Sequence, residues 1–123
     1  MDPQREHVLR EVEDNDVRFI RLWFTDITGT LKSVAIAPVE LEAALEDGIA
    51  FDGSAVQGLT RGHESDMVMR PDPSTFQLLP WSDDDTRSAR MLCSIYTPDG
   101  ELARTDPRGV LERALDRAAK HGF

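Results

Sequence analysis

The sequence predicts an α+β fold, and three observations support this class. Segments with apolar residues three and four positions apart, each opened by proline, predict helices. Runs rich in β-branched and aromatic residues predict strands. The order along the chain is helix, hairpin, helix, a glycine-rich loop and then two or three strands, which suits helices packed against a mixed or antiparallel sheet.

Length and composition restrict the possible functions. The 123 residues, 40% of them hydrophobic, are enough for one domain with its own core. A net charge of −9 gives no electrostatic reason to bind nucleic acid or an anionic membrane. No signal-peptide pattern and no apolar run of about 20 residues is visible, so we expect a cytoplasmic location. The single cysteine, Cys93, lies in an apolar run and is expected to be a core thiol without a disulfide.

The first half of the chain predicts two helices around a hairpin. Asp2-Pro3 has the pattern of an N-cap followed by proline, and the helix should end near Asn15. Residues 17–25, VRFIRLWFT, are apolar on both phases of a two-residue period, which predicts a strand covered on both faces, and hence central or partly covered. A turn should join it to a second strand at 31–37. Pro38 and Gly48 bound the next helix.

The second half predicts strands and a final helix. Candidate strands are 67–70, 76–81 (near an edge because of Pro80) and 89–97. A linker-like segment, GELART, precedes a helix that starts at Asp106-Pro107. The apolar stripe of that helix has no evident partner in the preceding domain, so we expect the 123 residues to be the front of a longer protein.

The stretch from Phe51 to Pro73 is the candidate functional segment. Three glycines, at 53, 58 and 62, oppose helix and strand, and apolar residues between them favour an ordered loop. The carboxylates of this stretch are Asp52, Glu64, Asp66 and Asp72. They can bind a cationic ligand, accept a proton or cap loop N–H groups, and spacing alone leaves these roles open.

Other kinds of site are poorly supported by the sequence. The three histidines, at 7, 63 and 121, lack metal-ligand spacing, and no glycine pattern forms a phosphate loop. The consecutive acids of residues 82–85 are expected to form a turn rather than a metal site.

The motifs of this stretch resemble the N-terminal domain of type I (bacterial) glutamine synthetase. The resemblance rests on Phe51-Asp52-Gly53-Ser54, Glu64-Ser65-Asp66-Met67 and Pro71-Asp72-Pro73. It extends upstream through Val17-Arg18-Phe19 and Phe24-Thr25-Asp26 and downstream through Asp106-Pro107-Arg108, at consistent spacing. It implies a β-grasp fold, a twisted mixed sheet packed on a helix, over residues 15–102. Residues 1–14 would be an N-terminal helix, and residues 103–123 a linker and the first helix of an absent catalytic domain.

The resemblance also implies an activity, ATP-dependent ligation of ammonia to glutamate. Family members are dodecamers in which each active site lies between the catalytic domain of one subunit and the N-terminal domain of its neighbour. ATP and Mg²⁺ or Mn²⁺ would be bound mainly by the catalytic domain, so the 123 residues alone should be inactive, with no metal ligand of their own.

Carried over residue by residue, the resemblance assigns Asp52 to ammonium binding and deprotonation, with Ser54 and Ala55 as neighbours. Glu64, Ser65 and Asp66 would contact the adjacent subunit and help close the site. Two departures are notable: the family commonly has a second serine where this chain has Ala55, and often an aromatic residue where it has Leu59.

Two alternatives to a glutamine synthetase therefore stay open. A γ-glutamyl-amine or polyamine ligase of the same family would suit the missing hydroxyl at Ala55. A non-catalytic β-grasp interaction module is the second alternative, and the coding sequence beyond codon 123 would distinguish it from both enzymes.

Overall fold

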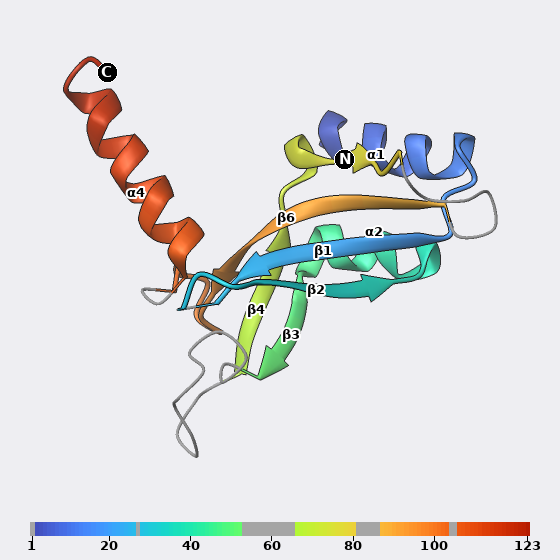
Figure 1. Ribbon diagram of the computed structural model, residues 1–123, viewed down its shortest axis with the longest axis horizontal. Helices are drawn as coiled ribbons and strands as arrows, with labels where there is room; N and C mark the ends of the chain where they lie inside the picture. Colours follow the sequence, from blue (N-terminus) through green and yellow to red (C-terminus); the bar gives the residue numbers. More distant parts are fainter. Residues whose placement is uncertain (1, 27, 53–65, 81–86, 104–105) are drawn as a thin grey trace. The chain divides into compact units, whose positions relative to one another are not determined.

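The computed structural model describes residues 2–26, 28–52, 66–80, 87–103 and 106–123 (Figure 1). In chain order the elements are α1 (Pro3–Asp14), β1 (Phe19–Thr25), β2 (Leu31–Ile36), α2 (Pro38–Asp47), β3 (Ile49–Asp52), β4 (Asp66–Pro71), the 3₁₀ helix η1 (Pro73–Thr75), β5 (Gln77–Leu78), β6 (Ser88–Tyr96) and α4 (Pro107–Lys120). This order confirms the predicted α+β class.

The strands form one mixed sheet in the order β2-β1-β6-β4-β3, and β5 pairs with β6 outside this path. β1 and β6 are parallel, with Ile20 opposite Ala89 and Leu22 opposite Met91. β5 is antiparallel to β6. The last long strand therefore lies between the N-terminal hairpin and the two strands that carry the candidate loop.

The helices begin and end where capping residues predict. The side chain of Asp2 accepts a hydrogen bond from the Gln4 N–H at the start of α1, and Asp106 does the same for Arg108 in α4. Gly48 ends α2 with a φ of 76°, a left-handed conformation that favours glycine. In the described part of the chain, Asp-Pro pairs therefore mark the starts of α1 and α4, and Pro38 and Gly48 mark the two ends of α2.

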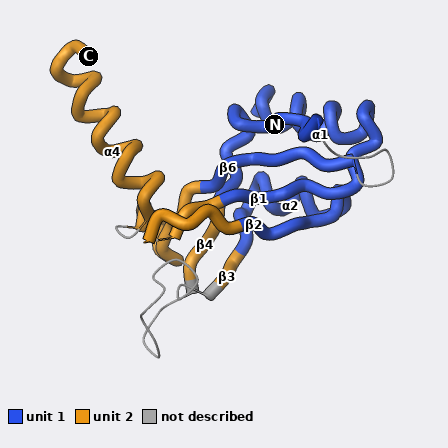
Figure 2. Tube along the Cα trace, in the orientation of Figure 1, with its two compact units in different colours: residues 1–23, 33–49, 70–93 blue, residues 24–32, 50–69, 94–123 orange. Residues whose placement is uncertain are grey.

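The contacts divide the chain into two compact units, and unit 1 comprises residues 1–23, 33–49 and 70–93 (Figure 2). Within it α1 contacts both α2 and η1. Its fully buried large side chains include Val8 of α1, Leu41 of α2 and Ile20 and Leu22 of β1. Cys93, also in unit 1, is buried, as predicted.

The first strand is central in the sheet, between β2 and β6, as predicted, but the prediction that it is covered on both faces is wrong. Along β1 the side chains alternate, with Ile20 and Leu22 fully buried and Phe19 43% exposed. Arg90 of β6 is paired with Arg21 of β1. The Arg90 guanidinium lies 5.6 Å from the centroid of the Trp23 ring. Part of the outer face of β1 is therefore covered by the Arg90 side chain, whose cation lies over the Trp23 ring, and not by another helix or strand.

The candidate strand at 76–81 is shorter than predicted, because only Gln77–Leu78 is extended in β5. Prolines at 73 and 80 interrupt the segment, and η1 takes up the residues before it. Trp81 and the predicted turn at 82–85 lie outside the described residues.

Unit 2 comprises residues 24–32, 50–69 and 94–123. Its buried side chains include Phe24, Met67, Met69 and Ile95. The segment predicted to be a linker is not free: Leu102 forms a bridge with Tyr96, and Ala103 donates to the Ile95 carbonyl over 2.9 Å. The prediction that the final helix has no partner in the preceding domain is wrong for its first turn, which is tied to β6. Val110, Leu111 and Leu115 are 52–59% exposed.

No helix among the described residues is long and apolar enough to span a membrane.

Candidate amine-binding loop

The candidate loop connects two neighbouring strands. β3 ends at Asp52 and β4 begins at Asp66, and the two strands are adjacent in the sheet. The arrowhead of β3 and the start of β4 meet at the same edge (Figure 1). Residues 53–65 are flanked by Asp52 and Asp66. Because adjacent strands are about 4.8 Å apart, the backbones of these two acidic residues lie at neighbouring strand ends.

The strand ends rest on an apolar base within unit 2. The rings of Phe24 and Phe51 lie with centroids 5.6 Å apart at an interplanar angle of 44°, which is an edge-tilted aromatic contact. Met69 is fully buried and Met67 is 8% exposed. This packing holds the backbone at both ends of the loop.

The predicted site residues fall into two groups. The backbones of Asp52 and Asp66 are placed at the ends of β3 and β4, and their side chains lie outside the described structure. Ser54, Ala55, Glu64 and Ser65 lie entirely outside the described residues. The fold thus brings the backbones of two predicted residues, 14 positions apart in sequence, to one edge of the sheet.

The fourth acid of the stretch, Asp72, has a structural role. Its Oδ1 accepts hydrogen bonds from the backbone N–H and the hydroxyl of Ser74, at 3.0 and 2.7 Å, and so caps η1. The Thr75 hydroxyl donates to the Asp72 carbonyl and accepts from the Leu92 N–H at 2.8 Å, which fixes this turn to β6. The Pro-Asp-Pro motif is therefore explained by capping, and it leaves the acids of residues 52–66 as candidates for ligand binding.

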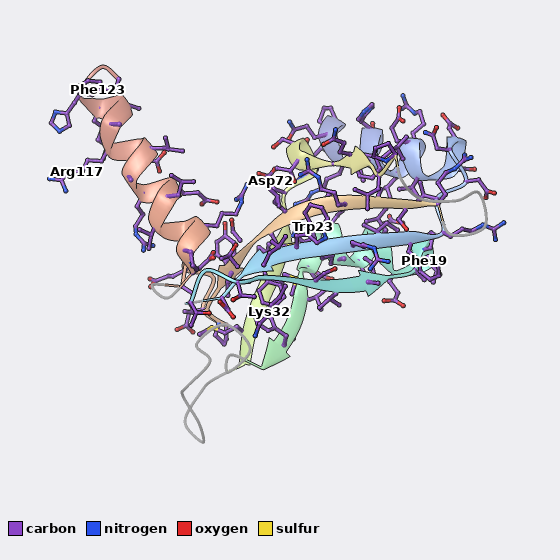
Figure 3. All side chains as sticks on the ribbon, in the orientation of Figure 1. Phe19, Trp23, Lys32, Asp72, Arg117 and Phe123 are labelled. Atoms are coloured by element: carbon purple, nitrogen blue, oxygen red, sulfur yellow. The ribbon has the colours of Figure 1, made fainter. Side chains whose placement is uncertain are left out.

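A second acid that the sequence motifs single out, Asp26, organises the turn between β1 and β2. Its Oδ1 accepts from the Thr28 N–H at 3.0 Å, the Thr28 hydroxyl at 2.7 Å and the Thr30 N–H at 2.9 Å. The Lys32 ammonium lies 3.5 Å from Oδ2, at the start of β2 (Figure 3). The Thr28 hydroxyl, followed by the Thr30 N–H, holds the pKa of Asp26 below its ordinary value of 3.8.

Replacing Asp26 should change how stability depends on pH. Because the folded state lowers the pKa of Asp26, the carboxylate stabilises the fold fully above pH 3.8 and loses this effect as the pH falls below that value. We expect Asp26→Asn to be destabilised relative to the wild type at pH 7 and to approach it at pH 3. Urea denaturation at several pH values measures this.

The control for this prediction is Asp116→Asn, which removes an exposed carboxylate from α4. Its difference from the wild type should stay small at every pH. An Asp26→Asn difference that is as large at pH 3 as at pH 7 would contradict the role given to the ionised carboxylate.

The ends of β3 and β4 bring two acidic residues, Asp52 and Asp66, to one edge of the sheet. Among the described residues, no group of three or more histidine, cysteine, aspartate or glutamate residues has the arrangement of a metal site. A carboxylate at a loop end can attract an ammonium group and accept a proton from it.

A mixed sheet of this order with helices packed on it is a β-grasp arrangement, the expected fold. Residues 16–98 match the family described as the β-grasp domain of glutamine synthetase. The chain belongs to this family.

Curated relatives give the same assignment. The glutamine synthetase of Mycolicibacterium smegmatis is 59% identical over 125 aligned residues, which cover 100% of this chain and 28% of the relative. The glutamine synthetase of Thermotoga maritima is 48% identical, covering 96% of this chain and 27% of the relative. The chain thus corresponds to the N-terminal part of proteins more than three times as long.

Solved structures support the fold independently. A structure titled as a GmaS/ADP complex superposes with a TM-score of 0.82 at 21% identity, over 93% of this chain and 26% of the other. A GmaS structure without ligand gives a TM-score of 0.81 over 92% of this chain. At this identity the likeness establishes the β-grasp fold alone.

Proposed function

We propose that the chain is the N-terminal domain of an ATP-dependent glutamate–ammonia ligase. The observation that carries this proposal is the 59% identity to a glutamine synthetase along the whole chain. Within the domain we propose the division 1–14, 15–102 and 103–123, with the β-grasp core in the middle segment and the catalytic domain beginning in the last.

The proposed reaction has two steps. The γ-phosphoryl group of ATP is transferred to the γ-carboxylate of glutamate, giving ADP and an acyl phosphate. Ammonium then loses a proton to Asp52, and the free ammonia attacks the acyl carbon as phosphate leaves, giving glutamine. Ammonium cannot attack before it is deprotonated, so a carboxylate in a confined loop is well suited to this step.

We propose that Asp52 acts at the active site of a neighbouring subunit in a homo-oligomer, a dodecamer as in the family. Ser54 and Ala55 would neighbour the ammonium, and Glu64, Ser65 and Asp66 would close the site against the adjacent subunit. The fold supports this role because Asp52 and Asp66 stand at the ends of two neighbouring strands, so the two ends of the loop lie next to each other. Closure by a second subunit would shield the acyl phosphate from water.

ATP and a divalent cation, Mg²⁺ or Mn²⁺, would be bound by parts of the protein beyond this chain. A reaction that draws on cellular ATP and glutamate is consistent with a cytoplasmic location, which we also propose.

A γ-glutamyl-amine ligase is the second candidate, and Ala55 is the observation that favours it. A serine hydroxyl at this position could bind a small cation, and its absence leaves space for a larger amine. An amine screen with the full-length protein distinguishes the candidates by following phosphate release with ammonium, methylamine, putrescine and spermidine in turn. Release that depends on ammonium supports the ligase proposed here, and release only with a larger amine supports the alternative. No amine-dependent release would overturn both and favour an interaction module.

Restoring the serine should alter amine preference. We expect Ala55→Ser to favour ammonium over methylamine roughly fivefold, because one added hydrogen bond contributes about 1 kcal/mol. The ratio of kcat/KM for the two amines measures this. Thr60→Val provides a matched control, since it changes a hydroxyl elsewhere in the same loop and should leave the ratio unaltered. An unchanged ratio in Ala55→Ser would contradict a role for this position in amine selection.

A further inference from the structure

A buried carboxylate joins the end of β6 to the start of α4. Asp106 is 0% exposed, and its Oδ2 accepts a hydrogen bond from the Ile95 N–H at 2.8 Å. Its Oδ1 accepts from the Arg108 N–H at 3.1 Å, which is the helix cap. One side chain therefore satisfies a strand N–H and a helix N–H together. Burial raises the pKa of Asp106, and the hydrogen bonds from these backbone groups oppose the rise.

A second set of polar contacts connects the same two elements. The Ser94 hydroxyl is 2.5 Å from Oε1 of Glu112, and Nη1 of Arg108 donates to Oγ of Ser94 at 2.6 Å. Arg108 and Glu112 also form an ion pair one helical turn apart. Ser94 is 5% exposed, whereas the side chains of Arg108 and Glu112 are 23% and 32% exposed, so these contacts are partly shielded from water.

The backbone approaches closely at this joint. A Cβ added to Gly109 would lie 3.4 Å from the Ala103 carbonyl oxygen and 3.6 Å from Oδ2 of Asp106. The Asp106 N–H donates to the Ala103 carbonyl, and the Ala103 N–H to the Ile95 carbonyl. Residues 94–112 thus contain three connections between strand and helix: a carboxylate bridge, a side-chain network and a chain reversal.

We infer that Asp106 is a positioning residue, which fixes the direction in which α4 leaves β6. Its strand contact goes beyond capping: at the same Asp-Pro start of α1, the side chain of the exposed Asp2 accepts from the Gln4 N–H of its own helix. Beyond the joint, α4 carries the exposed residues Val110, Leu111 and Leu115. Because a helix is straight over this length, the direction of its first turn determines where these residues lie.

The effect of this joint on catalysis rests on the proposed function. Asp52 and α4 belong to the same compact unit. If the loop serves a neighbouring subunit, the direction of α4 determines where the following catalytic domain lies relative to that loop. An α4 free to swing would leave the chemistry of each catalytic domain intact but would misplace the carboxylate that its neighbour supplies.

The test compares Asp106→Ala, Asp106→Asn and the control Asp2→Ala in the full-length protein. Hydrogen exchange, read on peptides that cover Ile95 and the first turn of α4, reports on the joint directly. We expect at least tenfold faster exchange in Asp106→Ala, since both N–H groups lose their acceptor. Asp106→Asn can still cap the helix, so the peptide with Ile95 should accelerate more than that of α4. Asp2→Ala should affect only the first turn of α1.

The kinetic readout separates positioning from simple destabilisation. In Asp106→Asn we expect the KM for ammonium to rise about tenfold, with the KM values for ATP and glutamate within about twofold. If Asp106→Ala does not fold, the exchange test rests on Asp106→Asn, which keeps the size of the side chain but places an amide NH₂ where one of the two acceptor oxygens was.

Unchanged exchange at Ile95 in the folded variants would overturn the joint. Accelerated exchange with an unchanged ammonium KM would overturn its link to the site. If the Asp106 variants show accelerated exchange but the wild-type protein shows no amine-dependent phosphate release, the joint is supported and the proposed function is contradicted.

Discussion

Asp52→Ala in the full-length protein should lower ammonium-dependent glutamine formation by about 10²- to 10⁴-fold, the range expected for loss of a general base. Acyl phosphate formation should continue, because the proposed phosphoryl transfer does not involve this carboxylate. Glutamine formation and ADP release are measured in parallel, and trapping with hydroxylamine reports the acyl phosphate.

Two further variants sharpen this test. Asp52→Asn keeps the size of the side chain and a hydrogen-bond acceptor but cannot take a proton at neutral pH, so it should resemble Asp52→Ala. Asp72→Asn removes a carboxylate that caps η1, only 20 positions further along, and should keep its turnover. Equal losses in glutamine formation and phosphoryl transfer would assign Asp52 to binding or folding rather than to proton removal.

Leu41→Ala should destabilise the domain by about 2–5 kcal/mol, the cost of removing a large buried side chain and leaving a cavity. Leu41 is 0% exposed and lies on α2 among the core residues of unit 1. Urea denaturation of the full-length protein, followed by a probe within this domain, gives the free energy of unfolding.

The control lies on the same helix. Val39 is 88% exposed, so Val39→Ala removes apolar atoms without creating a cavity and should change stability by no more than about 0.5 kcal/mol. A loss in Leu41→Ala no larger than that in Val39→Ala would mean that α2 does not anchor the core of unit 1.

Sequence patterns predicted the helices well because their signals are local. An Asp-Pro pair supplies both a cap and a suitable first residue, and Gly48 supplies the left-handed end of α2. The family resemblance led to the β-grasp fold, which the family match and the superposed structures confirm.

Features that depend on distant contacts were not predictable in this way. The apolar outer residues of β1 suggested two covered faces, whereas Trp23 is accommodated by Arg90, a residue more than 60 positions away. The partner of Asp106, the Ile95 N–H, is equally invisible in a linear pattern. For the candidate site, the sequence predicts residue types and a loop, and the fold adds that β3 and β4 are neighbours. The roles of Asp52, Ser54, Ala55, Glu64, Ser65 and Asp66 stay predictions.

The parallel pairing of β1 with β6 has a consequence for synthesis on the ribosome. Ile20 of β1 pairs with Ala89 of β6. About 70 further residues must therefore be synthesised before this edge of β1 can pair with β6. At roughly 5–20 residues per second, that interval lasts several seconds. Until then the edge of β1 that pairs with β6 is unpaired, and an unpaired strand edge can pair with other chains.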